Sequence, residues 1–189
     1  LLKARSQTRL KDSNPPGERA GTPPFLTRPV PDQTVPILRA IACDVDGTIT
    51  DRRRRVSTAA ISCIRGLADR GIEVVLASGN TACFLDALAR TFGTSGTVIA
   101  ENGGVYRIGF TGELRILGDR NISGRAYGVL EEYYRKRGVA LELFGDTYRF
   151  SDVAFARTVP PGEVREVVRG LGVKVLDTGF AIHLQPEGI

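Results

Sequence analysis

The feature that most constrains the fold is a short apolar run that ends on two aspartates. Residues 37 to 43 are mostly apolar and lead into Asp44-Val45-Asp46-Gly47-Thr48. Such a run is typical of a strand buried on both faces of a parallel sheet. Side chains alternate along an extended chain, so Asp44 and Asp46 are expected on the same side. Two carboxylates this close favour either a bound divalent cation or a nucleophile paired with an acid.

A second polar motif follows the next predicted strand. Residues 72 to 77 form an apolar run that leads into Ser78-Gly79-Asn80, and a helix is predicted over residues 81 to 92. A hydroxyl and free backbone N–H groups at this place suit a phosphate, with a simple helix cap as the alternative. Open α/β sheets bind ligands at the carboxyl ends of their strands, so we favour the phosphate role for Ser78 and Gly79.

The remaining pattern predicts a hairpin and then a small α/β unit. A helix capped by Ser57 and closed by Gly71 separates the first two strands. From about Asn121 the pattern reads as two copies of helix, strand, strand, the second helix starting at proline. The expected strands are residues 97–100, a hairpin of 105–108 with 113–117, and then 139–143, 148–154, 173–176 and 180–184.

The first motif resembles that of the haloacid dehalogenase (HAD) superfamily. The matching residues are Asp44-Val45-Asp46-Gly47-Thr48-Ile49-Thr50. The resemblance implies that Asp44 attacks phosphorus, that Asp46 is the general acid and base, and that both belong to a Mg²⁺ site. It also implies that Ser78 and Gly79 bind the substrate phosphate.

The second motif narrows the resemblance. Ser78-Gly79-Asn80 together with Glu101-Asn102-Gly103-Gly104 is similar to the archaeal-type phosphoglycolate phosphatases, whereas most sugar phosphatases of this subclass carry Thr-Gly-Arg. The implied fold is α/β, a partial doubly wound, Rossmann-like core with an inserted small α+β cap. The implied substrate is 2-phosphoglycolate. The expected parts are a basic, proline-rich disordered extension (residues 1–36), the first part of the core (37–119), the cap (120–186) and the start of a return to the core (187–189).

Two of the four HAD motifs are not recognisable. Between residue 37 and Lys136 there is no lysine to neutralise a phosphate. The pairs Gly118-Asp119 and Gly145-Asp146 fall beside cap elements and are interpreted as turns. We therefore expect a C-terminally truncated chain with an exposed sheet edge, and poor activity or stability.

Several alternatives remain open. One is a HAD sugar-phosphate phosphatase of the same cap class, and another is an inactive fragment that acts as a binding module. A manganese-dependent glycosyltransferase also carries Asp-x-Asp, but it leaves Ser78-Gly79-Asn80 without a role. The single histidine, His183, is interpreted as a hydrogen-bonded sheet or surface residue, with substrate contact as the alternative.

Charge and cysteine content point to an intracellular protein, and the family resemblance implies a small phosphorylated substrate as its partner. The net charge is +5, but six basic and three acidic residues precede residue 37, so the remainder is close to balanced and no nucleic-acid partner is expected. No apolar run approaches a membrane span. Cys43, Cys63 and Cys83 are widely spaced, which favours reduced thiols in the cytoplasm. The oligomeric state is not indicated.

Overall fold

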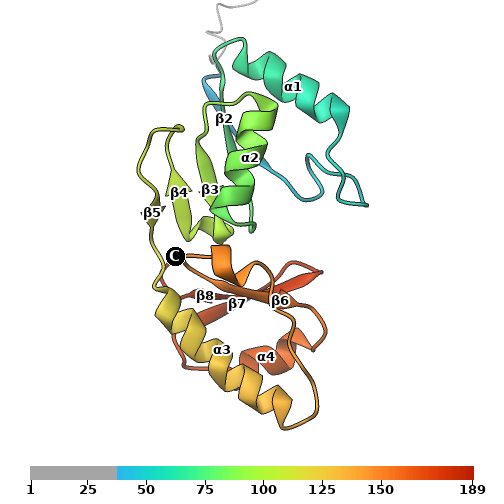
Figure 1. The fold of residues 1–189 in the computed structure, drawn as a ribbon, viewed down its shortest axis with the longest axis vertical. Coiled ribbons are helices and arrows are strands. Elements are labelled where there is room, and N and C mark those ends of the chain that lie inside the picture. Colours follow the sequence, from blue (N-terminus) through green and yellow to red (C-terminus); the bar gives the residue numbers. More distant parts are fainter. Residues whose placement is uncertain (1–37) are drawn as a thin grey trace, which may run out of the picture. The chain divides into compact units, whose positions relative to one another are not determined.

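The computed structural model describes residues 38–189, and the predicted extension over residues 1–36 lies outside this range. Residues 38–118 build a five-stranded sheet with two helices, called here the large-sheet part. Residues 119–186 build a three-stranded sheet with two more helices, called the small-sheet part (Figure 1). No helix in residues 38–189 has the length and apolar character needed to cross a membrane.

The large sheet is parallel at one side and antiparallel at the other. β1 (Ala40–Asp44), β2 (Glu73–Ala77) and β3 (Val98–Ala100) are parallel neighbours. β4 (Val105–Arg107) and β5 (Arg115–Ile116) continue the sheet as the predicted hairpin, giving the order β1-β2-β3-β4-β5. The three parallel strands place the ends of β1 and β2 side by side.

The two crossover helices form where the sequence predicts them. α1 (Thr58–Ala68) begins at Ser57, whose Oγ accepts a hydrogen bond from the Ala60 N–H at 3.4 Å. α2 (Ala82–Phe92) ends at Gly93, which has a φ of 76° and so takes the left-handed conformation that closes many helices. Both helices bury apolar side chains against β2 and β3, and this core includes Ile64, Val74, Leu76, Leu85, Phe92 and Val98.

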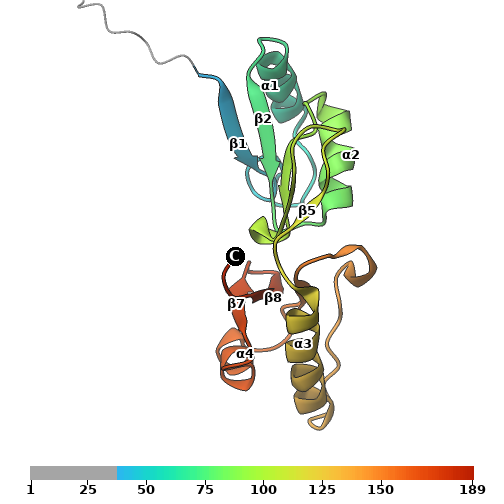
Figure 2. The same ribbon diagram turned by 90° about the vertical axis from the view of Figure 1, so that its left-hand side faces the viewer.

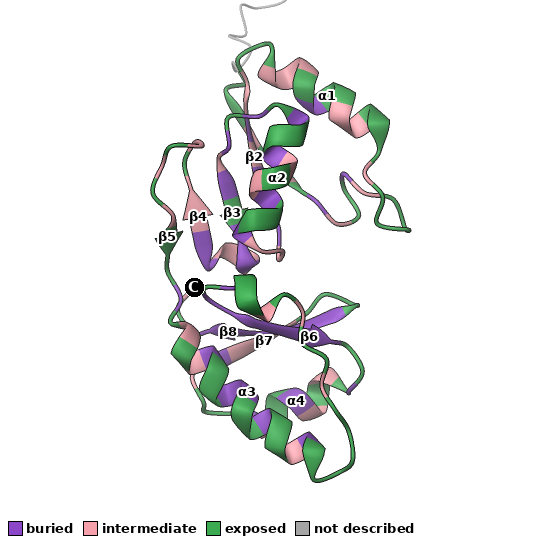
Figure 3. Cartoon of the chain, viewed as in Figure 1, coloured by how far each residue is buried: buried purple, intermediate pink, exposed green. Residues whose placement is uncertain are grey.

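Helices cover one face of the large sheet. Along β2, Val74 and Leu76 are buried whereas the alternate residues are partly exposed, and β1 alternates between exposed and intermediate residues (Figures 2 and 3). The prediction that β1 is buried on both faces is therefore wrong for residues 38–189, and the second helical layer of a doubly wound sheet is not seen in this range. Successive right-handed crossovers in one direction place α1 and α2 on the same face, where they contact each other.

The small-sheet part packs two helices on an antiparallel sheet of order β6-β8-β7. Its elements are α3 (Arg120–Arg135), β6 (Val153–Ala156), α4 (Pro161–Val167), β7 (Val173–Asp177) and β8 (Ala181–Pro186). Glu163 accepts hydrogen bonds from the hydroxyls of Tyr133 and Tyr134 at 2.7 and 2.9 Å, which ties α4 to α3. Asp119 caps α3 and Gly145 precedes a 3₁₀ turn, Asp146–Tyr148, so both Gly-Asp pairs lie at turns.

The first predicted helix-strand-strand copy is incomplete. Residues 139–143 form no regular strand and contribute a single antiparallel bridge, from Leu143 to Phe155. The strand predicted over residues 148–154 is instead β6, and the backbone N–H groups of residues 150 to 152 donate to the carboxylate of Glu101. A side chain from the large-sheet part has replaced the neighbouring strand as their acceptor.

Candidate functional site

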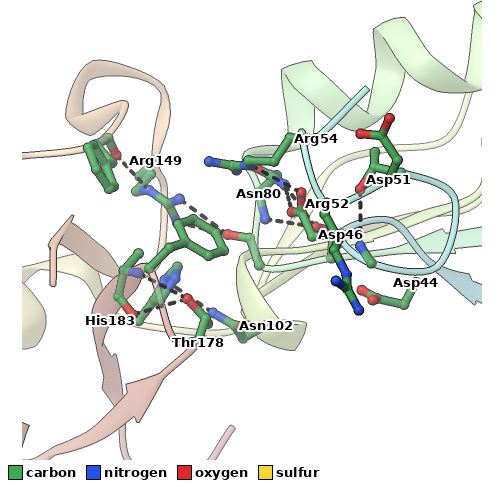
Figure 4. Close-up of a pocket in the computed structure, with 17 residues that line it drawn as sticks. Asp44, Asp46, Asp51, Arg52, Arg54, Asn80, Asn102, Arg149, Thr178 and His183 are labelled. Carbon is green, nitrogen blue, oxygen red and sulfur yellow. Dashed lines mark hydrogen bonds and ion pairs between the residues drawn. The ribbon is translucent and has the colours of Figure 1, made fainter. Parts of the chain in front are cut away.

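A cavity of about 600 Å³ lies between the large-sheet part and the small-sheet part. All four residues that the sequence singled out line it, namely Asp44, Asp46, Ser78 and Gly79. The opposite wall comes from the small-sheet part and consists of Phe144, Arg149, Thr178, Phe180, Ala181 and His183 (Figure 4). The volume is in the range of small-molecule sites.

The two aspartates stand at the end of β1 in different environments. The Asp44 side chain is exposed, and Thr48 Oγ1 donates to its Oδ2 at 3.4 Å. Asp46 is more enclosed, because Asn80 Nδ2 donates to its Oδ2 at 2.7 Å and Arg54 Nε lies 3.6 Å from its Oδ1. Gly47, with a φ of 85°, allows the sharp turn that follows. Asp46 is thus held in place whereas Asp44 is free to meet a ligand.

The Ser78-Gly79-Asn80 loop lies beside this pair. In the β1–β2 register Asp44 is opposite Ala77, the residue before Ser78. Ser78 Oγ accepts hydrogen bonds from the backbone and side-chain nitrogens of Asn80 at 3.1 and 3.0 Å. These contacts use oxygen lone pairs, so the hydroxyl hydrogen stays available to a ligand. The N-cap of α2 is Thr81, so Ser78 is not the helix cap that was the alternative.

Gly79 fits where a larger residue would collide. A Cβ added at Gly79 would lie 2.8 Å from Asn102 Oδ1 and 3.2 Å from Asn102 Nδ2. Its carbonyl oxygen accepts hydrogen bonds at 3.2 Å from both terminal nitrogens of Arg149 in the small-sheet part. The bonds from Arg149 fix the Gly79 peptide against the small-sheet part.

Arg149 and Asp152 form a buried ion pair behind the cavity wall. Their side chains are 5% and 0% exposed, and Arg149 Nη1 lies 2.6 Å from Asp152 Oδ1. Burial alone raises the pKa of Asp152, but the hydrogen bond from His183 and the charge of Arg149 outweigh it, so this pKa lies below its usual value. Asp152 is therefore a carboxylate at neutral pH.

Glu101 joins the two parts through a second buried carboxylate. It is fully buried, and it accepts hydrogen bonds from the Ser151 N–H at 2.8 Å and from the Phe150 N–H at 3.1 Å. Burial raises the pKa of Glu101, and these backbone donors oppose the rise. Gln185 Nε2 also donates to the carbonyl oxygen of Asn102 at 3.0 Å. The turn after β3 is thus bonded directly to the small sheet.

His183 is a hydrogen-bonded residue of the sheet, as the main sequence interpretation expects, and it is also buried and lines the cavity. Its Nδ1 lies 2.8 Å from Asp152 Oδ2 and 3.2 Å from Asn102 Nδ2. Strand β8 places His183 on the face turned toward the cavity, while Ile182 and Leu184 pack in the core beneath α3 and α4.

Arginines of the loop after β1 also reach the cavity. Arg52 and Arg54 line it. Arg54 has a φ of 61°, an uncommon conformation for a residue other than glycine, and its guanidinium carbon lies 4.2 Å from the centre of the Phe180 ring. Arg54 therefore contacts Asp46 on one wall and Phe180 on the other.

The donor set at Asp44 and Asp46 fits Mg²⁺ in chemistry. Mg²⁺ takes oxygen ligands and is commonly held by one or two carboxylates together with water and substrate phosphate. Among residues 38–189 no group of three or more histidine, cysteine or acidic side chains is placed to hold a metal by itself. The carboxylate of Asp44 and the backbone carbonyl oxygen of Asp46 can therefore supply part of a magnesium shell, with the rest coming from a phosphate and water.

The sequence missed the residues that connect the two walls. Arg149 and Asp152 fall in a segment predicted as a strand, and Glu101 was noted only as part of a motif. An arginine and an aspartate three residues apart are common on protein surfaces, so their spacing did not indicate that they belong to the site. Their importance comes from contacts with Gly79 and His183, which lie 70 residues before Arg149 and 31 residues after Asp152.

Comparison with known proteins agrees with this geometry. A family of haloacid dehalogenase-like hydrolases matches residues 41–160. A phosphoglycolate phosphatase of Methanoculleus marisnigri is 59% identical over 155 residues, which cover 81% of this chain and 66% of that protein. That of Methanospirillum hungatei is 54% identical over 153 residues, with the same coverage of both chains. The chain thus spans about two thirds of the length of these relatives.

A solved structure shows the same fold. The crystal structure of a Thermoplasma acidophilum protein superposes with a TM-score of 0.68 at 29% identity, covering 80% of this chain and 65% of the other. The family predicted from the motifs is therefore confirmed. Because the family matches residues 41–160 and two archaeal phosphoglycolate phosphatases share 54–59% of their aligned residues with it, this chain belongs to the haloacid dehalogenase-like hydrolase family.

Proposed function

We propose that this protein is a magnesium-dependent phosphatase that hydrolyses 2-phosphoglycolate through an aspartyl-phosphate on Asp44. The observation that carries the proposal is the β1–β2 register, which sets the exposed carboxylate of Asp44 beside the loop that begins at Ser78. A nucleophile and a group of hydrogen-bond donors for a phosphate thereby share one end of the cavity. The names of the two methanogen relatives support phosphoglycolate as the substrate.

The residues divide the reaction between them. Asp44 attacks phosphorus, and as the new O–P bond forms, the bond from phosphorus to the leaving oxygen breaks. Asp46, positioned by Asn80, gives its proton to that oxygen and then takes a proton from the water that attacks the aspartyl-phosphate. Inorganic phosphate leaves and Asp44 is restored. Ser78 Oγ–H and the Gly79 N–H hold the phosphate oxygens.

We also propose the roles of the metal and of the small-sheet part. Asp44 and the backbone carbonyl oxygen of Asp46 would hold Mg²⁺, whose positive charge would offset the repulsion between the Asp44 carboxylate and the phosphate. The small-sheet part acts as the cap of the family and limits the access of water to the cavity. Cys43, Cys63 and Cys83 are free thiols, which supports the cytoplasmic location that we propose.

Substitution of the nucleophile tests the proposal. In Asp44→Asn we expect loss of phosphoglycolate hydrolysis by at least about a thousandfold, with unchanged folding because the side chain is exposed. Asp69→Asn, at the end of α1, is the matched control and keeps activity. Steady turnover by Asp44→Asn would rule out the covalent mechanism. Faster hydrolysis of sugar phosphates than of phosphoglycolate would favour a sugar phosphatase instead.

One observation favours a binding-only module as the second candidate. In residues 38–189 the cations that line the cavity are Arg52, Arg54 and Arg149, and the two lysines of this range, Lys136 and Lys174, lie elsewhere. A phosphate would then be bound without the lysine that the family uses. Magnesium-dependent turnover excludes this candidate, whereas phosphate binding without turnover supports it.

A further inference from the structure

We propose that the small-sheet wall of the cavity contains a carboxylate subsite, in which Nε2 of His183 binds the acidic group of the substrate's leaving part. The inference rests on the proposed function, because it concerns the end of the phosphate ester that the Ser78 loop does not hold. Its ligands are short phosphorylated hydroxy acids, of which phosphoglycolate is the smallest.

The ring of His183 is fixed so that one nitrogen faces the protein and the other is open to the cavity. Nδ1 of His183 lies 2.8 Å from Asp152 Oδ2. The side-chain nitrogen of Asn102 lies 3.2 Å from the same Nδ1. Within residues 38–189 no side chain or backbone group is hydrogen-bonded to Nε2, although the residue is 2% exposed and lines the cavity (Figure 4). A nearly buried ring nitrogen open to a cavity is suited to a ligand.

The other polar groups of this wall already have partners inside the protein. Thr178 Oγ1 donates to the Ala181 carbonyl oxygen at 3.0 Å. The guanidinium of Arg149 donates to the carbonyl oxygens of Phe144 and Gly79 and to Asp152. In the described chain, His183 is therefore a polar side chain of the small-sheet wall with one atom, Nε2, that has no hydrogen-bond partner.

The distribution of charge favours an anion at this place. Carboxylates line the large-sheet wall, at Asp44, Asp46 and Asp51, whereas no carboxylate lines the small-sheet wall. Behind the ring, one oxygen of Asp152 lies against Nδ1 and the other pairs with Arg149. A ring that carries both protons donates from Nδ1 to Asp152 and from Nε2 to a bound carboxylate, in charge-assisted hydrogen bonds.

Magnetic resonance tests the subsite without any need for turnover. His183 is the single histidine of the chain, so histidine labelled with ¹³C gives one ring Hε1–Cε1 signal that can come from no other residue. With the phosphate site filled by inorganic phosphate, we expect added glycolate to move this signal to a saturating end point, while its uncharged amide, glycolamide, leaves it in place. No movement with glycolate, or equal movement with glycolamide, overturns the proposal.

Kinetics of His183→Asn provide the second test. Asparagine keeps a donor for Asp152 in place of Nδ1 but has nothing in place of Nε2. We expect KM for phosphoglycolate to rise about ten- to a hundredfold, while KM and kcat for ethyl phosphate, which has no carboxylate, change less than about twofold. Equal impairment with both esters overturns the subsite.

The two experiments separate this inference from the proposed function. If the unmodified protein hydrolyses neither ester, the proposed function fails, and the glycolate titration still decides whether the subsite exists. If phosphoglycolate is hydrolysed but glycolate leaves the histidine signal unmoved, the subsite fails while the proposed function stands. If His183→Asn does not fold, the titration of the unmodified protein gives the answer.

Discussion

Asn80 Nδ2 lies 2.7 Å from Asp46 Oδ2, although 34 positions separate the two residues. The same nitrogen lies 3.0 Å from Ser78 Oγ. A single amide therefore connects the proposed general acid to the proposed phosphate loop.

This contact predicts the effect of substitutions at Asn80. In Asn80→Ala we expect kcat/KM to fall about ten- to a hundredfold, because Asp46 loses a neutral donor that fixes its orientation. Asn80→Asp places a second carboxylate against Asp46 and lowers activity further. The unfolding free energy should change by less than about 1 kcal/mol, since Asn80 is partly exposed. Asn121→Ala, in the first turn of α3, is the control, and equal loss in both variants would contradict the role of Asn80.

A methyl group at Gly79 should be costly because of Asn102. The added Cβ would lie 2.8 Å from Asn102 Oδ1, and that amide also contacts His183. We expect Gly79→Ala to destabilise the protein by about 1–3 kcal/mol and to weaken phosphate binding. The same substitution at Gly124 in α3, where nothing lies within 4 Å, should stabilise by about 0.5–1 kcal/mol. Denaturant unfolding of the two variants checks the opposite signs.

Arg54 combines a strained backbone with a contact across the cavity. Its φ is 61°, so Arg54→Gly removes the side chain and the strain whereas Arg54→Ala removes the side chain alone. We expect Arg54→Gly to be more stable than Arg54→Ala by about 0.5–1 kcal/mol. At Arg53, which lacks a positive φ, the order should reverse. Denaturant unfolding of all four variants is the measurement, and the same order at both positions would contradict the strain.

The Arg149–Asp152 pair predicts a loss of stability in acid. The pKa of Asp152 is lower in the folded protein than its usual value, so its contribution is fully present above about pH 4 and is lost as the pH falls through the folded pKa. In Asp152→Asn the unfolding free energy should drop by about 3 kcal/mol at pH 7, because Arg149 keeps a buried charge without its counterion.

The pH dependence of that difference is the measurement. As the pH falls below about 4 and through the lower folded pKa of Asp152, the unmodified protein loses this contribution, so the difference in unfolding free energy between it and Asp152→Asn should shrink. Urea unfolding at pH 7 and at successively lower pH values checks this. A difference that stays constant over the whole range would show that Asp152 does not contribute through its charge.

Both site motifs could be predicted from sequence because each lies at the end of an apolar strand. Neighbouring parallel strands end at the same edge of a sheet, and the register of Asp44 with Ala77 is the result. The helix start at Ser57 was equally local, since a cap forms within one turn, whereas the first helix ends at Ala68, before the predicted Gly71. These features depend on residues near one another in the chain.

The predictions that failed depended on distant contacts. Residues 148–154 have the apolar pattern of a strand, but Glu101 accepts the backbone hydrogens of residues 150 to 152 and Arg149 turns toward Gly79. The exposed face of β1 could not be predicted from the sequence either, because the number of helical layers on a sheet depends on where other elements pack. The spacing of apolar residues along a segment indicates which of its faces is buried. It does not identify the element that covers that face.

The sequence by itself determined the family, the order of most elements and the positions of Asp44, Asp46, Ser78 and Gly79, because those features are encoded by short patterns along the chain. The tertiary structure decided the rest of the site. It brought Arg149, Asp152 and His183 against the Gly79 loop, and it buried Glu101 beneath the small sheet. Such contacts join residues that are far apart in the chain, and the free energy of burying a charge is offset only by partners that the fold supplies.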